Sequence, residues 1–152
     1  MTRVERQVLE VIVQVPECYA PNALARILAI GFAHPAHNAI GAAIARVESE
    51  RPGAGHDHAW LERLRELLPA DLQDAVAQIA VAPLPAANED ELERYGKGVI
   101  VGALDRSLNV EKQELLAELR RTDAVSQGER FSEINLRLVS IEADRRALRE
   151  QG

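Results

Sequence analysis

The sequence is poor in aromatic residues and cysteine, and it contains no long apolar run. Aromatic residues make up 3% of its 152 residues, and Cys18 is the single cysteine. One cysteine excludes an internal disulfide and fits a reducing compartment. No apolar run reaches the ~18 residues that a membrane-spanning helix needs, and we expect no signal peptide. These absences predict a cytoplasmic protein whose core is aliphatic.

The motifs of common catalytic sites are also missing. There is no phosphate-binding GxxxxGK[ST], no GxGxxG at a strand–helix junction, no GxSxG and no HExxH. Four histidines, His34, His37, His56 and His58, have spacings that could hold a metal ion, but no further ligand motif accompanies them. We interpret the first two as capping or packing residues and the other two as solvated loop residues. We therefore predict no catalytic residue, metal or cofactor, with a small metal-dependent helical enzyme as an alternative class.

Charge and hydropathy patterns favour a folded protein made of helices. The hydrophobic share is 47%, and the net charge of −6 argues against strong direct binding of nucleic acid. No segment shows the sustained alternation of apolar and polar residues that is typical of strands. The sequence therefore predicts an all-α fold.

The first 105 residues have the signals of a globular helical bundle. Thr2 and Glu5 have capping-box spacing and predict a helix that ends before Pro16. A short helix over about 22–29 is expected next, and Pro35 fits the first turn of another. Asp57 can cap a fourth helix, and Pro69 marks the start of a fifth. We expect residues 1–105 to form one subdomain.

The remaining chain predicts a long connecting helix and an antiparallel helical hairpin. Asn88 with Glu91 indicates a helix start, and helical periodicity continues to about Thr122. Ser126 with Glu129 indicates that a return helix starts after a short turn. We assign residues 106–152 to the hairpin.

Three glycines inside the long helix need an explanation, because each costs about 0.8–1 kcal/mol relative to alanine there. Gly96, Gly98 and Gly102 are these residues. We favour close packing of the helix against the globular subdomain, with a bend in the helix as the alternative.

The return helix carries two apolar stripes, although one suffices for a hairpin. Steps of three and four residues place one stripe in a coiled-coil seam, made of Phe131, Ile134, Leu138, Ile141 and Leu148. Leu136, Val139 and Ala143 form a second stripe, which we expect to face outward and to bind a partner. Arginines are expected to frame this stripe as an interface rim, namely Arg120, Arg121, Arg130, Arg137, Arg145, Arg146 and Arg149.

An ordered set of segments resembles a known family over essentially the whole chain. The segments are the opening VERQVLEVIVQVPE, the stretch GFAHPAHNAIGAAI, and LNVEKQELLAELRRTD followed by FSEINLRLVSIEADRRALRE. Together they resemble the C-terminal helicase-binding domain of bacterial DNA primase. The zinc-binding and polymerase domains of a primase are absent, so the resemblance implies that Met1 begins a piece of a longer protein.

The resemblance implies a non-catalytic interaction domain. Its hairpin would dock on the N-terminal domains of the hexameric replicative helicase during primer synthesis, while catalysis belongs to the parent RNA polymerase. Together with the stripes, it assigns the helicase contact to Leu119, Arg120, Phe131, Leu136, Arg137, Val139, Ala143 and Arg146. We expect a monomer in isolation, with a self-associating architectural helical protein as the alternative.

In some members of the family the globular part also binds the acidic C-terminal tail of single-stranded-DNA-binding protein. By position, the resemblance carries this site onto Arg3, Val4, Arg6 and Leu9. Glu5 lies among them and should repel an acidic tail.

Overall fold

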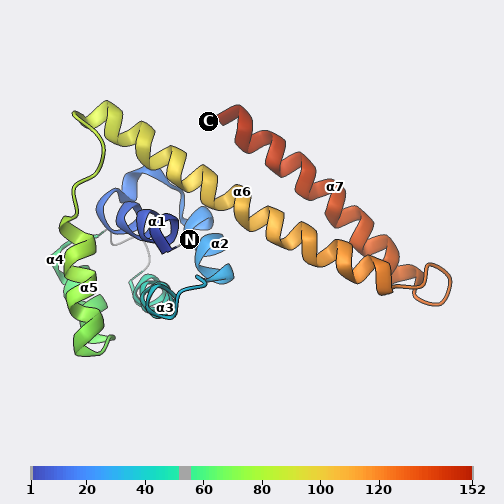
Figure 1. Cartoon of the computed structure of the whole chain (residues 1–152), viewed down its shortest axis with the longest axis horizontal. Coiled ribbons are helices and arrows are strands. Elements are labelled where there is room, and N and C mark those ends of the chain that lie inside the picture. Colours follow the sequence, from blue (N-terminus) through green and yellow to red (C-terminus); the bar gives the residue numbers. More distant parts are fainter. Residues whose placement is uncertain (1, 52–55, 152) are drawn as a thin grey trace. The chain divides into compact units, whose positions relative to one another are not determined.

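The computed structural model describes residues 2–51 and 56–151, and all regular structure in these residues is helical (Figure 1). The predicted all-α fold is therefore confirmed. In chain order the elements are α1 (Thr2–Gln14), the 3₁₀ turn η1 (Pro16–Cys18), α2 (Pro21–Ile30), α3 (Pro35–Glu50), α4 (His58–Glu66), α5 (Ala70–Val81), α6 (Glu89–Arg121) and α7 (Gly128–Gln151).

The chain divides into two compact units between Ile100 and Val101, within the long helix α6. The first unit holds α1 to α5 and the start of α6. The second holds the rest of α6 and α7. The functional division into 1–105 and 106–152 stays a prediction.

The core of the first unit is aliphatic, as the composition predicts. Helix α1 packs against α3 and α5, and α3 also contacts α2 and α4. The side chain of Gln14, at the end of α1, donates to the carbonyl oxygens of Ile79 and Ala82, at 2.8 and 2.9 Å. The side chains without exposed surface here include Leu9, Val11, Ile12, Ile44, Val47 and Leu64.

Local signals set most helix starts. Pro21 and Pro35 occupy first-turn positions, where a missing N–H leaves no backbone bond unmade. The carboxylate of Asp57 accepts from the Trp60 N–H at 2.8 Å and caps α4, as predicted. Asn88 accepts from the Glu91 N–H at 2.9 Å, and Glu91 accepts in return from the Ala87 N–H at 2.7 Å. The predicted start of the long helix is thus confirmed.

One predicted capping box is wrong, and the side chain of Thr2, on which another depends, lies outside the described residues. The carboxylate of Glu5 does not cap its own helix but accepts from the Ala33 and His34 N–H groups at the start of α3, at 2.6 and 3.2 Å. In the hairpin turn, Asp123 accepts from the Val125 N–H, and Gln127 accepts from the Asp123 N–H. The return helix begins at Gly128, so the predicted cap by Ser126 does not form. Both predictions rested on spacing alone.

Close packing explains one of the three glycines in α6. A Cβ atom on Gly96 would lie 2.7 Å from the Sγ atom of buried Cys18, so only glycine fits without movement. A Cβ atom on Gly98 would meet nothing within 4 Å, and one on Gly102 would meet only the end of Arg106. The packing interpretation is therefore confirmed for Gly96 and wrong for Gly98, which lies in the same unit.

Candidate interaction surface

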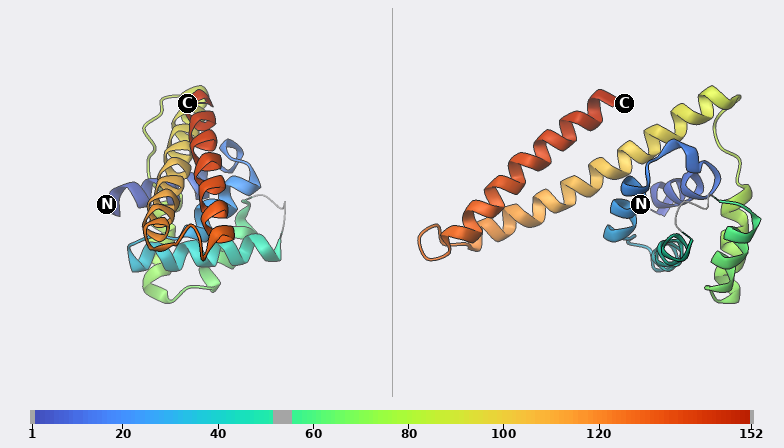
Figure 2. Two further views of the ribbon diagram at one scale, coloured as in Figure 1. Left: turned by 90° about the vertical axis from the view of Figure 1, so that its right-hand side faces the viewer. Right: turned by 180° about the vertical axis from the view of Figure 1, so that it is seen from behind.

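Helix α7 runs back along α6, as the views in Figures 1 and 2 agree. Two arginine–carboxylate pairs fix the register of this hairpin, because residue 130 bonds to residue 118 and residue 137 to residue 111. That register places Leu115 within one residue of the level of Ile134, and Leu108 within one residue of the level of Ile141. The antiparallel hairpin predicted from periodicity is what the structure contains.

The predicted seam is the buried side of α7. Ile134 and Ile141 have no exposed surface, and Leu108 of α6 is 1% exposed. Phe131, Leu138 and Leu148 are half-buried around them. A seven-residue spacing between the two isoleucines keeps them on one side of the helix, as in a coiled coil.

Charged pairs join the two helices along the seam. Arg130 bonds through two nitrogens to Glu118, both at 2.7 Å, and Arg137 bonds in the same way to Glu111 at 2.6 and 2.7 Å. Arg145 bonds to Asp105 at 2.8 and 3.3 Å. Bidentate pairs of this kind fix the relative orientation of the two side chains as well as bringing opposite charges together.

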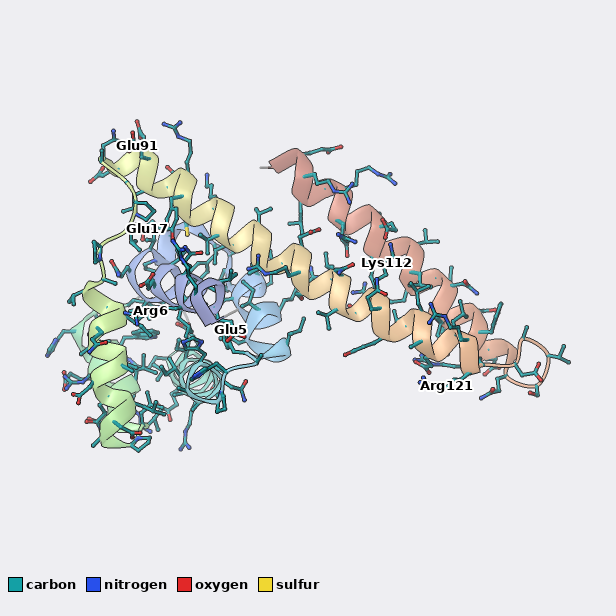
Figure 3. All side chains as sticks on the ribbon, in the orientation of Figure 1. Glu5, Arg6, Glu17, Glu91, Lys112 and Arg121 are labelled. Carbon is teal, nitrogen blue, oxygen red and sulfur yellow. The ribbon has the colours of Figure 1, made fainter. Side chains whose placement is uncertain are left out.

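A fourth pair joins Lys112 to Glu142, with nitrogen and oxygen 2.6 Å apart, and Figure 3 shows Lys112 on α6 in the hairpin. The hydrogen bonds from Arg130 and Arg145 hold the pKa values of Glu118 and Asp105 below their usual range. Lys112 does the same for the pKa of Glu142. These carboxyl groups are therefore ionised, and the pairs are charged, at neutral pH.

Three arginines of the predicted rim form ion pairs within the hairpin. Arg130, Arg137 and Arg145 pair with carboxylates of α6, and their contact with a partner stays a prediction. A signal in the sequence could have shown this. Glu111 and Glu118 are seven residues apart, as are Arg130 and Arg137, which is the spacing of facing charges in a coiled coil.

The second stripe of α7 lies on the surface. The side chain of Leu136 is 72% exposed and that of Val139 is 70% exposed, and Ala143 is exposed as well. A shallow hollow of about 430 Å³ lies beside Val139 and Ala143, between Leu138 and Arg146. Aliphatic side chains of this size are costly to leave in water when they gather on one face, which is why such faces usually mark a partner site.

The other predicted docking residues lie in three settings. Arg120 and Arg146 are exposed, and neither has an ion pair among the described residues. Leu119 and Phe131 are half-buried within the hairpin. Arg137 is half-buried and held by Glu111.

The residues assigned to a tail peptide lie at the start of α1. Arg3 and Arg6 are exposed, Val4 is 36% exposed, and Arg6 pairs with Glu10 at 3.3 Å. Leu9 has no exposed surface, so it belongs to the core and cannot touch a peptide in this structure.

Glu5, which we expected to repel an acidic tail, makes its hydrogen bonds with residues at the start of α3. Burial alone would raise the pKa of Glu5, but hydrogen bonds from His37, Ala33 and His34 outweigh it and lower that pKa. Its negative charge is therefore directed at the start of α3, where the backbone N–H groups stabilise it.

Each of the four histidines has a different setting. The Nδ1 atom of His34 accepts from the Ala36 N–H at 3.2 Å and caps α3, while His37 bonds to Glu5 at 3.1 Å. His58 is exposed at the start of α4. His56 is not a solvated loop residue as predicted, because its side chain is 6% exposed and stacks on Trp60. In the described part of the chain, no three His, Cys, Asp or Glu side chains are grouped to hold a metal ion.

Comparison with known proteins decides the family. The family model described as DNA primase DnaG DnaB-binding matches residues 5–134. The chain belongs to this family. This is the family that the sequence segments resemble, and the match runs from Glu5 to Ile134, in the first turns of α7.

Relatives and a solved structure agree with this membership. The DNA primase of Mycobacterium tuberculosis is 27% identical over 148 residues, and that of Mycobacterium leprae is 25% identical over the same length. These matches cover 97% of this chain but 23% of each primase, so the chain spans about a quarter of their length. The helicase binding domain of primase from Mycobacterium tuberculosis is similar in structure, with a TM-score of 0.77 and 26% identity over 99% of this chain and 92% of that one.

No helix in residues 2–51 and 56–151 is both long enough and apolar enough to span a membrane. Helices α6 and α7 are long, but charged residues recur along both of them.

Proposed function

We propose that this helicase-binding domain docks on the N-terminal domains of the replicative helicase through the outer stripe of α7. The observation that carries the proposal is the exposure of Leu136 and Val139, whose side chains face water although the seam of the same helix is closed. Membership of the DnaB-binding family supports the choice of partner. Because the helix is already formed and pinned by ion pairs, docking orders few groups.

The interface would have an apolar centre and a basic edge. Leu136, Val139 and Ala143 would form the centre, and Arg146 would pair with a carboxylate of the helicase. In this proposal the domain itself catalyses nothing and positions the polymerase of its parent primase, in the cytoplasm.

Substitution of the stripe tests this function. Leu136→Asp and Val139→Asp should each weaken binding to the isolated helicase N-terminal domain by about 30-fold or more, since buried interface anchors contribute about 2 kcal/mol or more. Isothermal titration calorimetry measures the change, and circular dichroism verifies that each variant keeps its helices.

Val110→Asp is the matched control, because Val110 is an exposed valine on α6, with 46% of its surface in water. It should bind with unchanged affinity. Equal weakening by Val110→Asp and Val139→Asp, or no weakening by either, would show that the outer stripe of α7 is not the helicase-binding surface.

Sedimentation of the free domain tests the alternative of self-association. That alternative requires a dimer in solution, and the dimer should dissociate in the Val139→Asp variant.

We also propose that the domain is a monomer and that the start of α1 offers a weak site for the acidic tail of single-stranded-DNA-binding protein. Arg3 and Arg6 would supply the positive charge and Val4 the apolar contact. The bonding of Glu5 to α3 lessens the repulsion that its charge would otherwise cause.

A further inference from the structure

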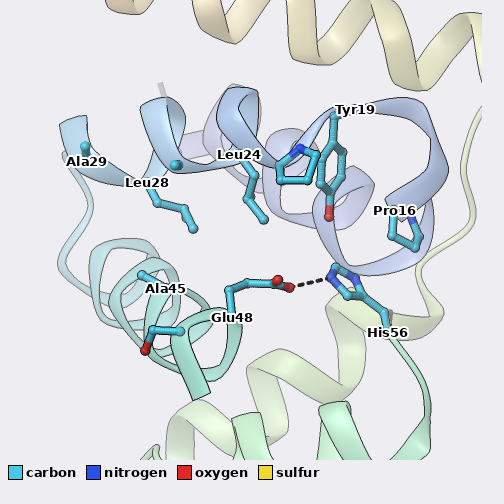
Figure 4. Close-up of a pocket in the computed structure, with 11 residues that line it drawn as sticks. Pro16, Tyr19, Leu24, Leu28, Ala29, Ala45, Glu48 and His56 are labelled. Carbon is cyan, nitrogen blue, oxygen red and sulfur yellow. Dashed lines mark hydrogen bonds and ion pairs between the residues drawn. The ribbon is translucent and has the colours of Figure 1, made fainter. Parts of the chain in front are cut away.

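An open groove lies between α2 and α3 in the first unit (Figure 4). Its volume is about 620 Å³, within the range of pockets that bind ligands. Its walls are mostly apolar and come from η1, α2 and α3, with the lining residues Pro16, Pro21, Leu24, Ala25, Leu28, Ala29 and Ala45.

The groove exists because small side chains line it. Ala25 and Ala29 on α2 and Ala45 on α3 are exposed, and larger side chains at these positions would fill the space. Alanines also let the backbone of a partner come close to both helices. This arrangement suits a helix that lays an apolar face into a groove.

One end of the groove is polar and fixed in geometry. The Nε2 atom of His56 lies 2.8 Å from the Oε1 atom of Glu48, and the Trp60 indole N–H donates to the same oxygen at 3.1 Å. The rings of His56 and Trp60 stack with their centres 3.8 Å apart. A buried histidine and a buried tryptophan therefore orient a single carboxylate at the groove, as Figure 4 shows for Glu48 and His56.

The other oxygen of that carboxylate is available. Among the described residues, Oε2 of Glu48 has no hydrogen-bond partner, and the side chain is 30% exposed. The nearby Tyr19 hydroxyl already donates to the carbonyl oxygen of Ile12 at 2.9 Å. Within the described residues no arginine or lysine lines the groove, so its polar end is an acceptor with negative charge and calls for a cationic donor.

We propose that the α2–α3 groove binds a partner polypeptide that inserts an apolar side chain between the two helices and pairs an arginine or lysine with Glu48. This site lies in the first unit, whereas the helicase surface proposed above lies on α7 in the second. The two proposals can therefore fail independently.

Trp60 provides the readout, because it is the single tryptophan and bonds directly to Glu48. The probe is a short alanine-based helical peptide with two leucines one turn apart and an arginine between them, titrated into the whole domain. We expect a saturable change in Trp60 fluorescence. Citrulline in place of arginine should weaken binding about tenfold, and glutamate should weaken it further.

Two variants test the two halves of the groove. Glu48→Gln keeps a hydrogen-bond acceptor for His56 and Trp60 but removes the charge, and should weaken the arginine peptide about tenfold while leaving the citrulline peptide unchanged. Ala45→Leu should abolish binding of every peptide by filling the groove. Ala42→Leu, at an exposed position of α3 outside the groove, is the matched control and should bind normally.

Three results would overturn the proposal. The first is equal affinity for the arginine, citrulline and glutamate peptides. The second is unchanged peptide affinity in the Ala45→Leu variant. The third is a change in Trp60 fluorescence when the protein concentration is raised in the absence of peptide. The last result would show that a second copy of the chain fills the groove. If Glu48→Gln fails to fold, the peptide series and Ala45→Leu still decide between these outcomes.

Discussion

The two compact units hold their helices together in different ways. In the first unit, several helices surround a core in which residues such as Leu9, Ile44 and Leu64 have no contact with water. In the second, two antiparallel helices share one narrow seam centred on Ile134 and Ile141. Two helices cannot enclose the apolar residues on all their faces, so part of the apolar surface of α7 stays outside. That surplus is the basis for the docking surface proposed on α7.

Polar contacts between elements differ in the same way. In the first unit several of them end on the main chain, as Gln14 does at Ile79 and Glu5 does at Ala33. In the described residues of the hairpin, the hydrogen bonds and ion pairs between α6 and α7 join charged side chains to each other or to Asn109. Salt screens pairs of exposed opposite charges, whereas a hydrogen bond between the neutral Gln14 amide and a main-chain carbonyl has no net charges to screen. The hairpin should therefore be the more salt-sensitive unit.

Removing part of the seam should have the largest effect. Ile141→Ala should lower the free energy of unfolding of the hairpin by about 2–5 kcal/mol, because the cavity cannot be filled by other helices. Leu136→Ala on the same helix should change it by less than about 0.5 kcal/mol, since Leu136 is exposed. Urea unfolding followed by circular dichroism gives the energies, and hydrogen exchange shows whether α7 loses protection. Similar losses in the two variants would contradict the assignment of seam and outer stripe.

A pair of glycines tests packing within the first unit. Gly96→Ala should destabilise by about 1–3 kcal/mol, because the new methyl group would lie 2.7 Å from the Sγ atom of Cys18, which is itself buried. Gly98→Ala should stabilise by about 0.5–1 kcal/mol, because it meets no neighbour and alanine favours a helix. Thermal unfolding of both variants gives the sign of each effect. A gain in stability from Gly96→Ala would show that Cys18 moves aside without cost.

The sequence predicted what local chemistry decides. Asn88 and Asp57 cap the helices expected of them, and the alternating apolar steps of α7 locate the seam at Ile134 and Ile141. The exposure of Leu136 and Val139 follows from the same periodicity, because residues on the far side of a two-helix hairpin have nothing to cover them.

Features that depend on distant residues were missed. Glu5 has partners 28 to 32 residues away, and nothing near it in the chain indicates them. His56 looked solvated because it lies in a polar loop, yet its ring is buried against Trp60. The groove was also missed, because an empty space between helices leaves no mark in hydrophobic periodicity beyond a few alanines.

The smallest expected effect concerns the ion pairs that distinguish the hairpin. Arg137→Ala, Glu111→Ala and the double variant form a cycle, and the coupling energy should be no more than about 1 kcal/mol because both side chains are more than a third exposed. High salt should reduce that coupling further, since the Debye length falls from about 10 Å at 0.1 M to about 3 Å at 1 M. Urea unfolding at both salt concentrations measures it. A coupling that salt leaves unchanged would mean that this pair is shielded like the main-chain bonds of the first unit, and the contrast between the units would then rest on the seam alone.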